Sequence, residues 1–353
     1  MRASSPRRGA FLGLAAACTF GVSAPLATRL VDDSDAQLLA GLLYLGAALA
    51  LAPALLTRRR RAEAPLRRDD APTLALVVLS GGVVAPVLLL IGLSRTGGLA
   101  GSLLLNLEGP LTVLVAVSVF GEHLTRRSAA AGVLVLAAAA LMGLTPGSLR
   151  IDPVGVLLIA AACAAWALDN NLTATLVARD PVVIVSTKVA VAGAVNLTIA
   201  VARGAAVPVG TALSAALALG AISYGISVLL DAYALRALGA AREAALFATA
   251  PFAGALLSIP LLGDRPTPVT TLAMVAMAGG AALLLTDRHG HAHRHAPVTH
   301  DHRHRHDDDH HDHGHDQGLA EGETPARHTH AHQHEPRRHV HAHASDAHHR
   351  HRH

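Results

Sequence analysis

Apolar residues run along the chain from Ala10 to Thr286 in long stretches that short polar segments separate. A helix needs roughly 20 such residues to span a bilayer. The stretches 133–144 and 154–168 lack the polar face of a soluble helix and the two-residue alternation of a β-barrel strand. The pattern predicts an all-α integral membrane protein with ten transmembrane helices, at residues 10–30, 36–56, 72–93, 98–119, 129–146, 153–174, 182–202, 211–234, 243–262 and 267–286.

Composition and charge agree with this pattern and orient it. Charged residues make up 15% of the chain, whereas a soluble domain carries about 25%. If the N-terminus is cytoplasmic, the segments on the inner side before the tail hold 14 arginines and those on the outer side hold five. Basic residues gather on the cytoplasmic side of membrane proteins. We therefore expect a multi-pass protein of the inner (plasma) membrane with both termini in the cytoplasm and with no nucleic-acid partner.

The chain also repeats itself. Gly109-Pro110 leads through an apolar stretch to Gly121-Glu122, and Ala250-Pro251 leads to Gly263-Asp264. A repeat of five helices crosses the membrane an odd number of times, so its second copy must be inverted, which is typical of secondary transporters. The predicted organisation is an N-terminal arm (1–9), two five-helix repeats (10–146 and 147–286) and a tail (287–353).

Three motifs resemble the EamA-type transporters of the drug/metabolite transporter superfamily. They are the stretch from Ser102 to Pro110 that leads into Gly121-Glu122, the stretch from Trp166 to Thr173, and the stretch from Leu238 to Phe252. Asp264 stands where the family usually has Glu. The resemblance covers Ala10 to Thr286 and implies ten helices and the export of a small solute, without catalytic residues. An enzyme is therefore not expected.

Ionisable and amide side chains inside the predicted helices are the candidate substrate or coupling groups, because a charge at a helix centre costs roughly 2.5–3.5 kcal/mol on insertion scales. They are Asn106, Glu108, Asp169, Asn170, Lys188 and Asp231. For Glu108, a local break at Gly109-Pro110 is expected, and a structural hydrogen bond is the alternative role.

The other candidates have structural alternatives too. Asp169 and Lys188 lie at similar depth on neighbouring helices, so either a buried ion pair or a gate would fit. Asp231 is predicted to be interfacial, beside Tyr233 and Arg236. The repeat-motif acids Glu122 and Asp264 are predicted to act in helix-start electrostatics or in packing between the repeats.

The tail holds 23 of the 24 histidines and has no apolar periodicity, so it is predicted to be disordered. Neutral imidazole binds Ni, Co, Zn and Cu. The predicted weak metal sites are His291, His293, His295, His300, His302, His304, His306, His310, His311, His313 and His315. No cofactor is required for the expected activity. A pH-dependent or lipid-directed tether is an alternative role for this tail.

Three functions remain open from the sequence. The first is a secondary transporter that exports a small metabolite or drug-like solute across the bilayer by alternating access. The second is efflux of divalent metal ions, with the tail as their collector. The third is a membrane-anchored metal sensor or storage protein. A homodimer is left open.

Overall fold

The computed structural model describes most of the helical region and four short parts of the tail. The described residues are 6–32, 34–58, 66–121, 124–144, 152–176, 179–238, 243, 246–286, 289–294, 299–304, 328–333 and 338–343. The predictions for Glu122, His295, His306, His310, His311, His313 and His315 lie outside them.

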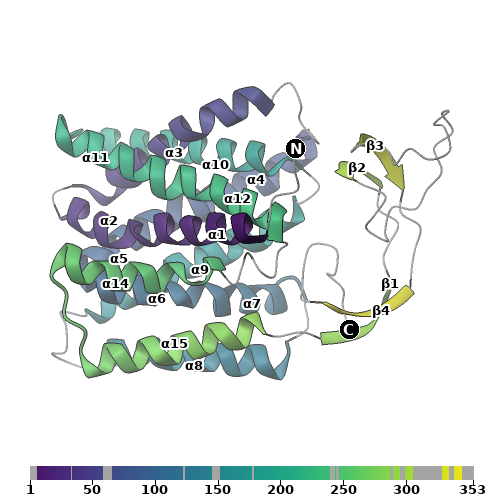
Figure 1. Ribbon diagram of the computed structural model, residues 1–353. Helices are drawn as coiled ribbons and strands as arrows, with labels where there is room; N and C mark the ends of the chain where they lie inside the picture. Colours follow the sequence, from purple (N-terminus) through teal and green to yellow (C-terminus); the bar gives the residue numbers. More distant parts are fainter. Residues whose placement is uncertain are drawn as a thin grey trace.

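Helices fill both halves of the chain (Figure 1). The first half contains α1 (Pro6–Gly21), α2 (Ser23–Val31), α3 (Ala36–Arg58), η1 (Arg68–Asp70), α4 (Ala71–Val77), η2 (Val78–Val84), α5 (Ala85–Thr96), α6 (Gly98–Leu104), η3 (Leu105–Leu107), α7 (Glu108–Ser118) and α8 (Arg126–Leu144). The second half contains α9 (Pro153–Thr175), α10 (Pro181–Ala202), α11 (Thr211–Gly220), η4 (Ala221–Ile226), α12 (Ser227–Leu238), α14 (Ala250–Leu262) and α15 (Pro268–Leu285).

The fold class is confirmed. Among the described residues, eight helical stretches are long and apolar enough to cross a membrane. The 19-residue α8 and the 13-residue apolar α14 bring the helical stretches to ten. Several predicted helices are built from shorter pieces: the third and eighth each contain a π-helical segment, η2 and η4, and the fourth contains the 3-10 turn η3.

The two halves pack with the symmetry that an inverted repeat predicts. The second, fourth and fifth helices of one half each pack on their own counterparts, as α3 on α10, α6 on α14 and α8 on α15. A further contact between the halves also has a counterpart, because α1 packs on α12 as α9 packs on α5. The π-helical segments η2 and η4 also occupy equivalent helices. Exchanging the halves therefore preserves these main contacts between helices.

Small residues allow these helices to approach closely. A Cβ at Gly220 would lie 1.9 Å from the carbonyl oxygen of Leu43, and one at Gly46 would lie 2.1 Å from that of Leu217. The backbones of α3 and α11 therefore touch at two places. These contacts join the two halves through α3.

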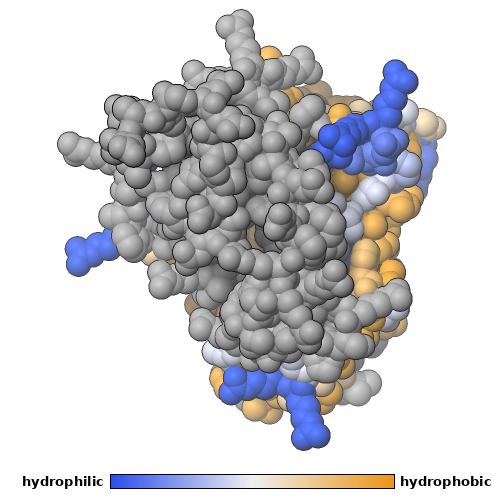
Figure 2. Space-filling view, turned by 90° about the vertical axis from the view of Figure 1, so that its right-hand side faces the viewer, coloured by the Kyte–Doolittle hydropathy of each residue, from blue (hydrophilic) through white to orange (hydrophobic). Residues whose placement is uncertain are grey.

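Large apolar side chains face outwards. Phe11, Val133, Leu157 and Val275 are examples that are at least 65% exposed. Figure 2 views the end of the bundle at which α1 begins and shows hydrophobic residues along the visible flank, with hydrophilic side chains at the rim. A soluble protein rarely exposes so much apolar surface. Here this surface contacts the lipid bilayer.

The position of the termini agrees with an even number of crossings, because α1 begins and α15 ends at the same end of the bundle (Figure 1). We call this the terminal end and the opposite one the loop end.

Four short parts of the tail form β-strands. It contains the strands β1 (His289–Arg294), β2 (Thr299–His304), β3 (His328–Gln333) and β4 (Arg338–His343). β1 pairs with β4 and β2 with β3, both antiparallel. Alternating His-x-His sequences suit the two-residue repeat of a strand, but an isolated two-stranded pair is at best marginally stable in water. The described parts of the tail are therefore short, paired, extended segments.

Candidate functional site

The centre of the site is the π-helical segment η2 of the third membrane helix. A π-helical turn leaves main-chain carbonyls without their usual helical donors, and inside a membrane other groups must satisfy them. Tyr44 Oη and Trp166 Nε1 donate to the carbonyl oxygen of Gly81 at 2.8 and 3.0 Å. Asn196 Nδ2 donates to that of Gly82 at 3.0 Å. Side chains from α3, α9 and α10 thus converge on this irregular segment.

Beside η2 lies an ion pair between Lys188 on α10 and Asp169 on α9. The Asp169 side chain is 3% exposed and the Lys188 side chain 18%, so both are largely buried. Thr173 Oγ1 lies 3.3 Å from Asp169 Oδ1. A Cβ at Gly81 would lie 2.1 Å from Asp169 Oδ2, so the glycine makes room for the carboxylate. The structure brings the two charges together as their similar depth predicted.

A second polar pair is accessible. Asn170 Nδ2 donates to Glu108 Oε1 at 2.7 Å, and this bond joins α9 to α7. Asn170 is exposed and Glu108 half-buried, whereas Asp169, the residue before Asn170, is buried. Successive helix residues point about 100° apart, so α9 presents Asp169 to the interior and Asn170 to an open surface. The pair is a carboxylate and an amide that are hydrogen-bonded to each other within the membrane region.

The helix break at Glu108 lies before this residue, not at Gly109-Pro110 as predicted. The 3-10 turn η3 covers Leu105–Leu107, and α7 begins at Glu108 with Pro110 in its first turn. Proline is tolerated there because the first amides of a helix need no intrahelical acceptor. The break thus places Glu108 at the start of α7.

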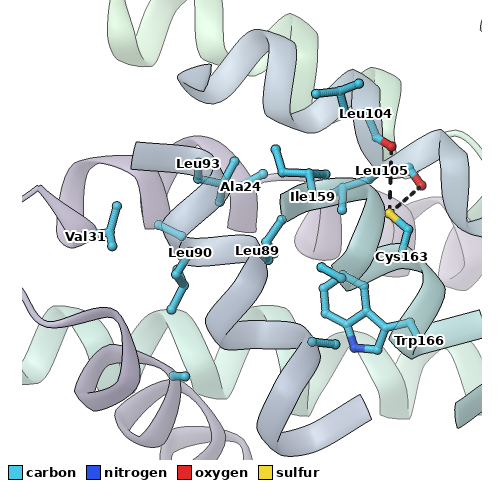
Figure 3. Packing of buried hydrophobic residues seen from close by; sticks show 14 of the residues in the cluster. Ala24, Val31, Leu89, Leu90, Leu93, Leu104, Leu105, Ile159, Cys163 and Trp166 are labelled. Atoms are coloured by element: carbon cyan, nitrogen blue, oxygen red, sulfur yellow. Dashed lines mark hydrogen bonds between the residues drawn. The ribbon is translucent and has the colours of Figure 1, made fainter. Parts of the chain in front are cut away.

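A cysteine side chain lies close to the main-chain carbonyls at this break. Cys163 Sγ lies 3.8 Å from the Leu104 oxygen and 4.0 Å from the Leu105 oxygen (Figure 3). The thiol is a weak donor, so Cys163 partly satisfies carbonyls of the interrupted fourth helix. Cys18, by contrast, is exposed on α1.

The other candidate amides act mainly between or within helices. Asn106 Nδ2 donates to the Leu103 carbonyl of its own helical stretch at 2.9 Å. Asn171 Nδ2 bonds the Thr112 carbonyl at 3.0 Å and so links α9 to α7. These contacts are structural, and a transport role for Asn106 stays a prediction.

Asp231 lies at the end of the apolar stretch Thr211–Asp231 that is long enough to span a membrane, and α12 continues beyond it to Leu238. Its role at the interface stays a prediction. Asp231 interacts electrostatically with Glu243, a buried residue that the sequence reasoning missed. The sequence could have identified Glu243 as a candidate, because it is an ionisable residue within the predicted helix 243–262.

Polar contacts also join neighbouring helices at the loop end of the bundle. Arg95 Nη1 lies 2.6 Å from Asp152 Oδ2, and this guanidinium lowers the pKa of Asp152 below its ordinary value. Asp264 Oδ2 accepts the Leu99 amide at 2.9 Å, at the start of α6. Asp264 thus caps a helix of the other half, as expected for packing between repeats, while Thr267 caps the following helix α15.

Replacing Asp264 with alanine should lower the free energy of unfolding by about 1 kcal/mol, because the Leu99 amide loses its acceptor. Thermal unfolding in detergent measures this loss. Asp264→Asn keeps an acceptor oxygen and should lose less. Equal melting temperatures for the wild type and the alanine variant would contradict a capping role.

At the terminal end, Arg179 makes a two-point contact with Asp70. Arg179 Nε and Nη2 lie 2.7 and 3.1 Å from the two carboxylate oxygens. This contact joins the start of the third membrane helix to the segment between α9 and α10. Each end of the bundle therefore has its own ion pair.

Metal-binding side chains do not gather in this region. Among the described residues of the membrane helices, no three His, Cys, Asp or Glu side chains form a group that could hold a metal ion.

Comparisons with known proteins agree with this architecture. The profile of the EamA-like transporter family matches residues 7–144 and 153–286. An "Uncharacterized transporter" of Methanothermobacter thermautotrophicus (strain ATCC 29096 / DSM 1053 / JCM 10044 / NBRC 100330 / Delta H) is 30% identical over 237 residues, which cover 65% of this chain and 68% of the relative. A crystal structure matches with a TM-score of 0.58 at 22% identity and covers 78% of this chain and 94% of that one. This last likeness concerns the fold alone.

Proposed function

Because this chain belongs to the EamA-like transporter family, we propose that it is a secondary active transporter that exports a small organic solute by alternating access. Membrane transport follows from the family, and the ten apolar helices contact the bilayer. The proposal for the solute rests on one observation, the accessible Glu108–Asn170 pair beside the buried Asp169–Lys188 pair.

In this proposal the carboxylate of Glu108 binds the proton and the solute in turn. This carboxylate accepts the Asn170 amide at 2.7 Å, and it can bind either a proton or a cationic or hydrogen-bonding group of the solute. Competition between proton and solute at one carboxylate would couple their movements. A charged residue within the membrane is a functional candidate because it is costly to keep there.

The Asp169–Lys188 pair has a supporting role. It fixes α9 against α10 and thereby sets the position of Asn170, the residue next to Asp169. The neighbouring η2 segment is irregular, and π-helical turns are frequent at functional sites.

Alternating access would make and break the contacts at the two ends in turn. Arg95–Asp152 and Asp264–Leu99 tie the loop end, and Arg179–Asp70 ties the terminal end. The bias of arginines supports a cytoplasmic position for the terminal end and export across the plasma membrane. Opening to either side requires the contacts of that side to separate.

The test uses full-length protein in liposomes that contain a pH-sensitive dye. A panel of amino acids, amines and organic acids is added outside at pH 7, and proton movement is recorded for each compound. Glu108→Gln cannot release a proton, so we expect at least a tenfold loss of any solute-driven proton movement. Ser118→Ala is the matched control, because this exposed serine of α7 bonds only the Leu114 carbonyl of its own helix among the described contacts.

Two outcomes would overturn the proposal. Full solute-driven proton movement in Glu108→Gln would remove Glu108 from the coupling site. A response to Zn²⁺ or Ni²⁺ alone, with none to any organic compound, would make divalent metal the cargo.

A further inference from the structure

The tail carries an internal repeat that the transport function does not use. Residues 288–304 and 327–343 share the pattern Arg-His-x-His-Ala-His-x-His-x-Pro-x-x-His-x-His-x-His. The first three histidines of this pattern lie as far from its first histidine as the last three lie from its end. Two copies that run antiparallel therefore set these histidines opposite one another.

The strands of the tail pair in this way. In the outer pair, β1 and β4, the opposed histidines are His289 and His343, His291 and His341, and His293 and His339. In the inner pair, β2 and β3, they are His300 and His332, His302 and His330, and His304 and His328. Each pair of strands thus contains three His–His rungs at alternate positions.

Both pairs follow one register. Each copy has its proline, Pro297 or Pro336, between its two strands in the sequence. Proline cannot donate to a ladder and is found at interruptions of pairing. The repeat therefore divides the tail into two separate His ladders.

We propose that each ladder is a binding site for divalent cations of the zinc, nickel, cobalt and copper class, built from cross-strand histidine pairs. Residues i and i+2 of a strand share one face, and directly opposed residues have Cβ atoms about 4.5–5.5 Å apart. Each rung thus places two histidines directly opposite one another, and the neighbouring rungs repeat this arrangement two residues along the strands. Imidazole is a good ligand for these metals, and water or neighbouring carboxylates complete the shell.

The metal would also supply the stability that the strands lack. An isolated two-stranded pair is marginal in water, and metal binding to a loosely ordered site contributes folding free energy. Binding would then join the beginning of the tail, at β1, to β4 near its end. This differs from sites that each lie within one strand, where every strand would bind metal by itself.

Cross-strand sites and single-strand sites differ in how the losses of bound Zn²⁺ caused by separate substitutions combine. The test measures these losses in the full-length protein in detergent micelles. The Zn²⁺ bound per chain is determined by equilibrium dialysis at pH 7.5. Three variants each replace three histidines by alanine: positions 289, 291 and 293 in β1, positions 328, 330 and 332 in β3, and positions 339, 341 and 343 in β4. Two combinations, β1 with β4 and β1 with β3, each remove six histidines.

Cross-strand ladders predict that the β1 and β4 variants lose the same ions, so that their combination loses no more than either one. The β1 and β3 variants damage different ladders, so their combination should lose about twice as much as either. Equal losses for the two combinations would overturn the proposal and assign the metal to single strands. Unchanged Zn²⁺ binding in all five variants would overturn it as well.

A distance measurement gives a second readout that does not depend on the number of ions. Ala292 and Val340 are register partners in β1 and β4, whereas Ala331 lies in β3. Spin labels at 292 and 340 should come closer on addition of Zn²⁺. Labels at 292 and 331 should not reach the same short distance, and the opposite result would contradict the register.

Discussion

Replacing Lys188 with methionine should lower the free energy of unfolding by about 3–5 kcal/mol, because it leaves a buried carboxylate without its partner. The Asp169 side chain is 3% exposed. Its other described contact is with Thr173, at 3.3 Å. Unfolding by SDS in mixed micelles gives this free energy.

The double variant Asp169→Asn/Lys188→Met provides the decisive comparison. It removes both charges, so it should recover most of the stability that the single variant loses. Arg95→Met is the matched surface control, because the Arg95 and Asp152 side chains are 46% and 34% exposed. Pairs of this kind contribute about 0–1 kcal/mol. If the double variant is as unstable as Lys188→Met, the loss comes from packing and not from charge.

Replacing Gly220 with alanine should destabilise the protein by about 3 kcal/mol, at the upper end of the usual cost of overpacking. The new Cβ would lie 1.9 Å from the carbonyl oxygen of Leu43 and 2.6 Å from its carbon. These are main-chain atoms of α3, so no side-chain rotation relieves the clash. The two helices would have to move apart, which a lower melting temperature in detergent would report.

Gly279→Ala is the control for this change. Its Cβ would lie 3.5 Å from Leu134 Cδ2, an ordinary contact with a flexible side chain. Because alanine favours a helix by up to about 1 kcal/mol over glycine, this variant should be as stable as the wild type or more so. A Gly220→Ala protein that melts at the wild-type temperature would show that α3 and α11 are not in close contact.

The sequence alone predicted which parts of the chain are helical. Apolar runs that are long enough to span a bilayer can form only a few structures there, because every main-chain polar group must be paired. The family resemblance was confirmed by the profile match over both halves. The depth of Asp169 and Lys188 followed from counting residues along α9 and α10, and the structure pairs them.

The sequence did not predict where helices are interrupted. η2 and η4 have no proline inside them, but Gly81 and Gly82 lie within η2 and Pro86 follows it, so the missing amide of this proline was a local signal that the prediction did not use. The π-helical turns persist because distant side chains, such as Tyr44, Trp166 and Asn196, satisfy the carbonyls of η2. The sequence reasoning also left out Glu243, a buried residue that interacts electrostatically with Asp231.

Hydrophobicity along the chain thus determined the number of crossings, and the motifs determined the family, because both depend on neighbours in sequence. Tertiary structure decided which polar groups meet. Asn170 reaches Glu108 and Asp264 reaches Leu99 across 62 and 165 residues of chain. Such contacts depend on how the two halves pack, and that packing is set by close backbone approaches such as that of Gly220 to Leu43.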